Sequence, residues 1–258
     1  MNAVESEGDQ FTTIEVPVVQ GEAITFHCEN NLNSRWVSRD ILMGRTYPIL
    51  PFVTDVSVIA DIGANCGATT VLLAHHYPEA TIHAVEPGSR QRSLIERNVA
   101  SLPRVVVHPI GLSDADREMR LYRGIENSGT SSIVQSAHTS NESEIVQIRS
   151  ASRWANENAI DHIDILKVDV EGCETAVLNS LSKLLETVKV LYVEYDGRVA
   201  RLEIDALLAP THELYVGSMF LDQGECVYIS KALADETAAT DHLRSQFAGL
   251  QDENRHAR

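Results

Sequence analysis

The sequence predicts an α/β protein in which a mostly parallel sheet is flanked by helices. From Val58 onward, apolar β-rich runs alternate with helix-like stretches, which is typical of a parallel sheet with helical crossovers. In residues 174–186, leucine and valine side chains recur at helical spacing on one face, as a helix that covers a sheet requires. The length of 258 residues fits one large α/β domain or two small ones.

Seven segments are predicted to be strands because each is a short run rich in β-branched or aromatic residues: VIADIG (58–63), TIHAVEP (81–87), VVVHPIG (105–111), HIDILKVDV (162–170), KVLYVEY (189–195), ELYVGSM (213–219) and CVYIS (226–230). Helices are predicted between them at 68–76, 89–101, 174–186 and 199–208. Residues 119–149 interrupt this alternation with two β-rich runs around a Ser/Thr/Asn-rich stretch. This pattern predicts a hairpin with a long polar loop, inserted in the sheet, and such insertions often cover a site.

Three parts of the chain follow from this pattern. Residues 1–55 form an N-terminal strand and cap segment, with short strands expected at 11–19 and 23–27, and we expect this segment on the substrate side. Residues 56–231 form the α/β domain with the inserted hairpin. Residues 232–258 form a polar tail, predicted to be helical around Leu243, Phe247 and Leu250.

Composition excludes several classes of protein. Hydrophobic residues make up 43% and charged residues 22%, which is ordinary for a globular domain. A net charge of −16 without a basic cluster disfavours a nucleic-acid partner. No apolar run reaches the ~18 residues of a membrane span, and the acidic start MNAVESEGDQ lacks the features of a signal peptide. The four cysteines are widely separated and form no CxxC pair, so we expect reduced thiols in a cytoplasmic protein without a membrane partner.

The segment DIGANCG (61–67) combines a strand end, a glycine turn and a helix start, the geometry that holds a nucleotide at the carboxyl edge of a sheet. An Asp61 carboxylate at the mouth of the turn would repel a pyrophosphate and favour a cationic ligand. Glu86 ends the next strand, where an acid accepts hydrogen bonds from ribose hydroxyls, and Asp114 could receive an adenine amino group. Together these features predict S-adenosylmethionine as the ligand. The alternative is that Asp61 and Glu86 only cap the turn and helix that follow them.

A second charged cluster, KVDVEGCE (167–174), ends the fourth predicted strand. On a strand, Lys167, Asp169 and Glu171 would point to one side, and three charges at the end of an apolar strand are costly without a purpose. We therefore interpret Asp169 and Glu171 as site acids, with a helix cap and a salt bridge to Lys167 as the alternative. Glu194, which interrupts the strand KVLYVEY, is either a further site acid or a paired core charge.

The segments DIGANCG, AVEP, GLSD, GTSS (129–132), IDILKVDVEGCE and VLYVEYD resemble the FkbM family of S-adenosylmethionine-dependent methyltransferases, over residues 55–196. The resemblance implies a class I Rossmann-like methyltransferase fold with strand order 3-2-1-4-5-7-6. It also implies O-methylation of a hydroxyl on a sugar, a polyketide or another secondary metabolite. The positions that the motifs assign to the cofactor S-adenosyl-L-methionine are Asp61, Gly63, Asn65, Gly67, Glu86, Pro87, Ser113 and Asp114.

For catalysis we expect Asp169 or Glu171 as the base that takes the hydroxyl proton, with Glu194 in support. A divalent cation on these three carboxylates is a less favoured alternative, because the resemblance requires no metal. Histidines are weaker candidates for the base, namely His27, His138 and His212. Trp36 and Trp154 lie in the two segments expected to cover the site, where either could line a pocket for the acceptor or simply pack.

The sequence is also compatible with other functions. The acceptor atom could be a nitrogen or a carboxylate instead of a hydroxyl, and a Rossmann-like protein that binds without catalysis would keep the same motifs. A nicotinamide-dependent oxidoreductase is disfavoured by Asp61 and by the absence of a GxGxxG sequence. The expected partner is a small-molecule acceptor, and a homodimer is compatible with the sequence.

Overall fold

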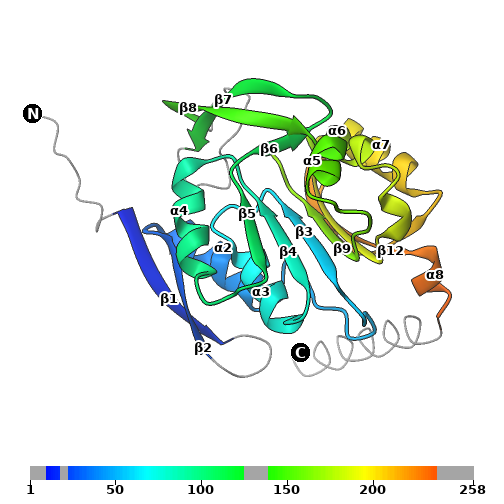
Figure 1. The fold of residues 1–258 in the computed structure, drawn as a ribbon, viewed down its shortest axis with the longest axis horizontal. Coiled ribbons are helices and arrows are strands. Elements are labelled where there is room, and N and C mark those ends of the chain that lie inside the picture. The colour runs from blue at the N-terminus through cyan, green and yellow to red at the C-terminus, as the bar shows by residue number, and fades with distance from the viewer. Residues whose placement is uncertain (1–9, 18–22, 125–138, 237–258) are drawn as a thin grey trace, which may run out of the picture.

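The computed structural model describes residues 10–17, 23–124 and 139–236. Its centre is a seven-stranded sheet in the spatial order β11-β12-β10-β9-β3-β4-β5 (Figure 1). The strands of this sheet are β3 (Val58–Ile62), β4 (Thr81–Val85), β5 (Val105–His108), β9 (Ile165–Val168), β10 (Val190–Asp196), β11 (His212–Met219) and β12 (Gln223–Ser230).

The sheet has the strand order that the resemblance implied. Numbered along the chain from β3, the seven strands lie in the order 3-2-1-4-5-7-6. All neighbouring pairs from β5 to β10 are parallel, whereas β12 runs antiparallel to both β10 and β11. The predicted α/β class with a Rossmann-like, mostly parallel sheet is therefore confirmed. The β-rich runs are buried on both faces, which is why they read as continuous apolar stretches.

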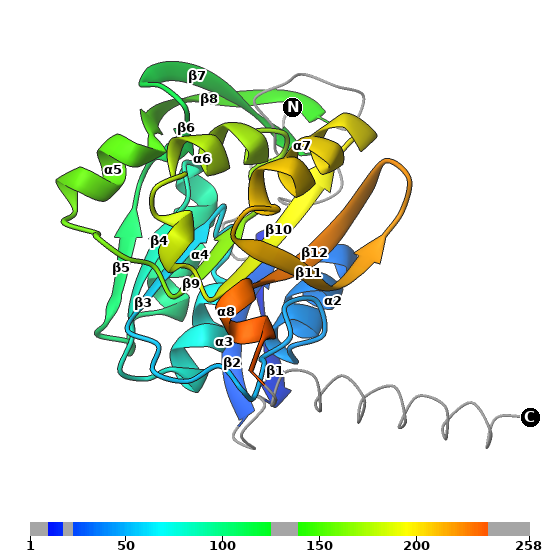
Figure 2. The ribbon, with the colours of Figure 1, turned by 90° about the vertical axis from the view of Figure 1, so that its right-hand side faces the viewer.

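Helices cover both faces of the sheet (Figure 2). One face packs against α5 (Ala151–Glu157), α6 (Glu174–Ser180) and α7 (Arg198–Leu208). The other face packs against α3 (Ala68–His76), α4 (Ser89–Asn98) and the short α8 (Lys231–Ala234). Because β3, β4, β9 and β10 are parallel, their carboxyl ends meet at one edge of the sheet, where ligands bind in folds of this type.

Several predicted elements differ in extent from the observed ones; the strand expected over 162–170, for example, is confined to Ile165–Val168. The helix expected over 174–186 ends at Ser180, and a separate 3₁₀ turn (Leu185–Thr187) precedes β10. Leu181 and Leu185 are nevertheless buried, so their apolar spacing is satisfied by a turn as well as by a helix. The strand expected over 105–111 is divided at Pro109, which has no N–H to donate to a ladder. Helix α5 was not predicted.

The inserted segment forms its own small sheet. Strands β7 (Arg117–Gly124) and β8 (Thr139–Ser150) pair antiparallel, and β8 also pairs with β6 (Gly111–Ser113) in the order β6-β8-β7. The hairpin therefore does not extend the seven-stranded sheet, contrary to the expectation that it is inserted there. The GTSS sequence (129–132) and His138 lie outside the described residues.

The N-terminal segment forms a hairpin, β1 (Phe11–Pro17) and β2 (Ala23–Glu29), followed by α2 (Leu32–Leu42). Asn31 caps α2 by accepting a hydrogen bond of 2.7 Å from the Ser34 amide. Buried side chains of β1, β2 and α2 join the cluster that contains α3 and α4, and this packing brings α2 to the carboxyl edge of the sheet. Helices among the described residues are too short or too polar to cross a membrane. The helix expected around Leu243 lies outside the described residues.

Candidate functional site

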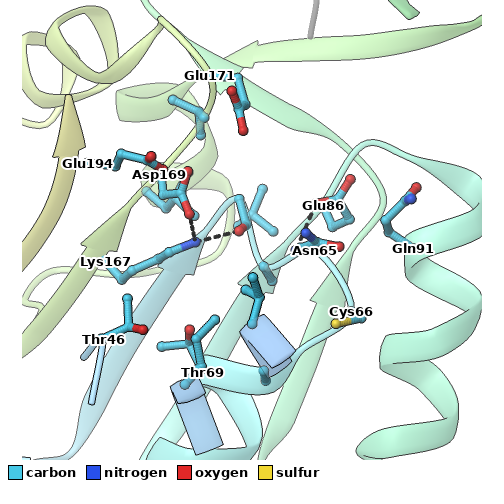
Figure 3. A pocket seen from close by; sticks show the side chains of 18 of the residues that line it. Thr46, Asn65, Cys66, Thr69, Glu86, Gln91, Lys167, Asp169, Glu171 and Glu194 are labelled. Atoms are coloured by element: carbon cyan, nitrogen blue, oxygen red, sulfur yellow. Dashed lines mark hydrogen bonds and ion pairs between the residues drawn. The ribbon is translucent and has the colours of Figure 1, made fainter. Parts of the chain in front are cut away.

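A cavity of about 700 Å³ opens at the carboxyl ends of β3, β4, β9 and β10 (Figure 3). Much of its wall comes from the turn after β3, the end of β4, the segment after β9, the end of β10 and the N-terminal segment around α2. Strands β6, β7 and β8 add apolar side chains, and the β11–β12 hairpin contributes to the side near β10.

The turn after β3 has the tight backbone that its glycines predict. Gly63 and Gly67 have φ angles of +81° and +86°, where residues with a side chain are strained. A Cβ atom on Gly63 would lie 1.7 Å from the Asp169 carbonyl oxygen, so this turn packs backbone to backbone on the segment after β9. Gly63 and Asn65 line the cavity, while Gly67 is the N-cap residue of α3.

Glu86 lies at the end of β4 and spans the glycine turn. Its Oε2 accepts a hydrogen bond of 2.9 Å from the Asn65 amide, and its Oε1 accepts one of 2.8 Å from the Gly88 amide. Burial raises the pKa of Glu86 to about 7 despite these two bonds. Gly88 is the N-cap residue of α4, so Glu86 satisfies a helix terminus and also lines the cavity together with Pro87.

Asp61 does not lie at the open mouth of the turn, and that expectation is corrected. Its side chain is completely buried beneath the wall of the cavity. Asp61 Oδ2 accepts a hydrogen bond of 2.6 Å from the Thr70 hydroxyl, and Oδ1 lies 3.6 Å from Lys167 Nζ. The Asp61 carboxylate therefore does not line the cavity, but it interacts with Lys167, which does.

Ser113 and Asp114 differ in position. Ser113, at the end of β6, is buried and lines the cavity. The Asp114 side chain is 62% exposed, forms an ion pair of 3.2 Å with Arg117 and is not part of the wall. Contact of Asp114 with an adenine amino group therefore stays a prediction, and it would require the carboxylate to leave the ion pair with Arg117.

Across the cavity from Glu86 lie three carboxyl groups, those of Asp169, Glu171 and Glu194 (Figure 3). Each offers a carboxylate oxygen, and these atoms all lie within 4.8 Å of one another. Strand β9 ends at Val168, so Asp169 follows the strand and Glu171 occupies a turn with a φ angle of +56°. The predicted alternation along one strand therefore does not extend to Glu171, although all three acids converge.

Crowding separates the protonation states of these acids. Burial raises the pKa of Glu171 to about 9, and the nearby Asp169 adds to the effect. The adjacent Asp169, followed by burial, raises the pKa of Glu194 to about 11, and the two carboxyl groups share a hydrogen bond. Burial opposes ionisation of Asp169 as well, but Lys167 and hydrogen bonds to this carboxylate outweigh it and lower its pKa. Near neutral pH, Asp169 is therefore the ionised member of the cluster.

Lys167 and Tyr47 complete the cluster and were not predicted as site residues. Lys167 is buried, with Nζ 3.1 Å from Asp169 Oδ2, and it donates a hydrogen bond of 2.5 Å to the Gly63 carbonyl. The Tyr47 hydroxyl donates a hydrogen bond of 3.2 Å to Asp169 Oδ2. The position of Lys167 within an apolar strand was a signal in the sequence that could have marked it as a site residue. Nothing in the local sequence marked Tyr47, which reaches the cluster by packing edge-on against Tyr192.

The carboxylates are the kind of ligand that a hard divalent cation takes. Lys167 already places a positive charge against Asp169, and Tyr47 uses the same Asp169 oxygen. A metal ion there would have to displace or repel a buried ammonium group. The geometry therefore fits a protonated carboxyl cluster better than a metal centre.

Further candidate residues are divided between the cavity and the core. Trp36 of α2 lines the cavity and is 65% exposed, whereas Trp154 is buried against His83 and His108. His212 is buried and hydrogen-bonds to the Val188 carbonyl at 2.9 Å. His27 lies on β2 outside the wall of the cavity, so the structure places neither His27 nor His212 at the acid cluster.

Residues 61–214 match the family model described as the methyltransferase FkbM domain, which is more than half of the chain. Three proteins of known name are similar in sequence to this chain. Methyltransferase 1 of Beauveria bassiana is 28% identical over 170 residues, which cover 58% of this chain and 68% of that protein. The AMB antimetabolite synthetase AmbE of Pseudomonas aeruginosa is 26% identical over 246 residues, which cover 78% of this chain but only 11% of AmbE.

The third relative is the 2-O-methyltransferase NoeI of Sinorhizobium fredii. It is 24% identical over 155 residues, which cover 55% of this chain and 64% of NoeI. The chain therefore spans less than two thirds of NoeI and a small part of AmbE. In the matched segment lie the glycine turn, Glu86, Lys167 and the carboxyl cluster.

Proposed function

Because the chain belongs to the FkbM methyltransferase family, we propose that it transfers the methyl group of S-adenosylmethionine to a hydroxyl oxygen of a small molecule. Methyltransferase activity follows from the family. The cofactor, the acceptor atom and the role of each residue are parts of the proposal, supported by the shape and charge of the cavity. A small-molecule acceptor fits a cavity of about 700 Å³.

The observation that carries the proposal is the position of Glu86. It lies in the cavity wall at the carboxyl end of β4, and the Asn65 and Gly88 amides fix its carboxylate. Each of its oxygens keeps a lone pair that can accept a hydrogen bond from a ribose hydroxyl. The glycine turn beside it lets the rest of the cofactor lie against backbone, and the acidic cluster opposite favours the positive sulfonium.

Methyl transfer requires an aligned oxygen nucleophile and a base. When bound, S-adenosylmethionine would supply an activated methyl group for the hydroxyl oxygen, and Glu86 with the turn at Gly63 would hold the cofactor. We assign Asp169 as the base that takes the hydroxyl proton, because it is the ionised acid of the cluster. Glu171, with a pKa raised to about 9, is protonated near neutral pH and can orient the acceptor by donating a hydrogen bond.

The acceptor side of the cavity is acidic. Besides the cluster, Asp196 and Glu225 line it, and burial followed by the nearby Asp169 raises the pKa of each. An anionic acceptor would meet these groups unfavourably. A hydroxyl acceptor is supported by the relative NoeI, a 2-O-methyltransferase. The same carboxyl groups would also bind a protonated amine, and Asp169 would take its proton before the nitrogen attacks, so N-methylation is the second candidate.

Isothermal titration with S-adenosylhomocysteine tests the cofactor. We expect micromolar binding by the native protein and its loss in Glu86→Ala, because both ribose contacts disappear. Glu79→Ala is the matched control, since Glu79 is 84% exposed and pairs with the surface residue Arg104 far from the cavity wall. Native protein that gives no heat, or Glu86→Ala that binds equally well, would refute the proposed cofactor site. Binding would justify an acceptor screen with labelled methyl groups, and resistance of the product to mild alkali together with its mass would distinguish ether from ester products.

A further inference from the structure

Lys167 is the one buried lysine in the described part of the chain, and its ammonium group has two partners at the end of β3 as well as Asp169. It donates to the Gly63 carbonyl at 2.5 Å and lies 3.1 Å from Asp169 Oδ2 and 3.6 Å from Asp61 Oδ1. On the basis of the proposed function, we propose that Lys167 is a positioning residue that joins the cofactor-side turn at Gly63 to Asp169 through one ammonium group.

The buried Asp61 supports this role from behind the cavity. A completely buried carboxylate is costly unless a positive charge or hydrogen bonds compensate it. Thr70 satisfies Oδ2, but Oδ1 has no hydrogen-bond partner among the described residues. Lys167 is the cation that faces this oxygen. Asp61 therefore holds the ammonium group in place, which explains an acid in the DIG sequence without any contact to a ligand.

On the cavity side, Lys167 is the group that offsets the charges around Asp169. The other titratable groups that interact with Asp169 are acids and one phenol: Tyr47, Glu171, Glu174, Glu194, Asp196 and Glu225. Tyr47 and the protonated Glu194 donate hydrogen bonds to Asp169, whereas the remaining acids disfavour a negative charge on it. Lys167 therefore keeps Asp169 ionised and able to accept a proton.

The Gly63 contact extends the effect to the cofactor side. The backbone of Gly63 already packs on the Asp169 carbonyl, where no side chain would fit. The bond from Lys167 to the Gly63 carbonyl fixes the same two segments through a second link. Because alignment of the reacting groups governs methyl transfer, a shift of this turn relative to Asp169 would misplace the methyl group.

The first measurement is S-adenosylhomocysteine affinity by isothermal titration in the native protein, Lys167→Met and Lys189→Met. Lys189 is the matched control, because it also pairs with an aspartate (Asp164, 3.0 Å) and donates to backbone carbonyls, but at the opposite end of the sheet. We expect Lys167→Met to bind at least about tenfold more weakly, as for loss of a charge-assisted hydrogen bond. We expect Lys189→Met to retain native affinity.

The second measurement is the ionisation of Asp169, from the ¹³C carboxyl resonances of protein labelled at aspartate, with Asp169→Asn for assignment. Asp169 should stay ionised from pH 6 to 9 in the native protein and in Lys189→Met, and should titrate within this range in Lys167→Met. If Lys167→Met does not fold, Lys167→Arg replaces it. Arginine keeps the charge but cannot place one nitrogen among three partners, so Asp169 should stay ionised while affinity falls.

The outcomes separate the two proposals. Native protein that does not bind S-adenosylhomocysteine contradicts the proposed function itself. Native protein that binds, with Lys167→Met showing native affinity and an Asp169 that remains ionised, overturns the positioning role and leaves the proposed function standing. If Lys167→Arg is used, unchanged affinity overturns it equally.

Discussion

The two ends of the parallel sheet each hold a lysine and an aspartate, but they use them differently. At the amino end, Asp164 accepts hydrogen bonds from the Ser57 amide and hydroxyl and from the Val58 amide, and it pairs with Lys189 at 3.0 Å. These interactions outweigh partial burial and lower the pKa of Asp164.

At the carboxyl end, one ammonium group is surrounded by several acids. Lys167 keeps the pKa of Asp169 low, but those of Glu171 and Glu194 rise to about 9 and about 11. The carboxylate oxygens of Asp164 therefore have enough hydrogen-bond donors within the protein, and this residue stabilises the fold. At the carboxyl end, the single ammonium group of Lys167 is too little positive charge to keep Glu171 and Glu194 ionised as well, and a cationic ligand would add positive charge there.

The largest expected effect is on turnover in Asp169→Asn. Loss of a general base reduces turnover by roughly 10²–10⁴-fold, while S-adenosylhomocysteine affinity should stay near native. The measurement is transfer of a labelled methyl group to an acceptor found by screening, with Glu171→Gln in parallel. Because glutamine keeps a hydrogen-bond donor, Glu171→Gln should lose far less activity. A larger loss in Glu171→Gln than in Asp169→Asn would reverse the assignment of the base.

The corresponding change at the amino end, Asp164→Asn, should affect stability instead. We expect the free energy of unfolding to fall by about 2 kcal/mol at pH 7, because a charged acceptor of several hydrogen bonds is lost. The folded-state pKa of Asp164 is lowered, so its contribution is complete above the unfolded pKa of about 4 and is lost as pH falls through the folded pKa. Urea unfolding at pH 7 and pH 3 checks this. Equal differences at both pH values would contradict it.

Glu86→Gln should weaken S-adenosylhomocysteine binding by roughly 10- to 100-fold, because the ribose hydroxyls lose an ionised acceptor. In the native protein, the Glu86 pKa of about 7 means that affinity should fall as pH drops from 8 to 6. Titration calorimetry at pH 6, 7 and 8 measures both effects. A native pH dependence that persists in Glu86→Gln would assign the proton to another group.

The smallest expected effect is a gain in stability from Glu171→Gln. The folded-state pKa of Glu171 is raised to about 9, so this residue destabilises the fold as pH rises from the unfolded pKa of about 4.3 toward 9. At pH 8, Glu171→Gln should raise the free energy of unfolding by about 1 kcal/mol. At pH 4 the gain should disappear. A loss of stability at pH 8 would show that the ionised form is satisfied in the folded protein.

Local patterns were enough to locate the strands of the sheet, whereas the strand order came from the family resemblance. Short apolar runs such as VIADIG and KVLYVEY form buried strands as predicted, and the helix over 68–76 has the predicted bounds. The patterns failed where two different backbone conformations, a helix and a turn, can bury the same side chains. Leu181 and Leu185 are buried although the α-helix ends at Ser180, so their apolar spacing did not distinguish a longer helix from a turn.

Spacing and composition predict the strands, the glycine turn and four of the acids that line the cavity, Glu86, Asp169, Glu171 and Glu194, because parallel strands bring their carboxyl ends to one edge. Only the tertiary structure decided which charges face the cavity. Asp61 is completely buried behind Lys167, Asp114 turns to Arg117, and Tyr47 reaches Asp169 across more than a hundred residues of chain. The physical reason is that burial, charge and hydrogen-bond partners belong to neighbours in space, which no local spacing records.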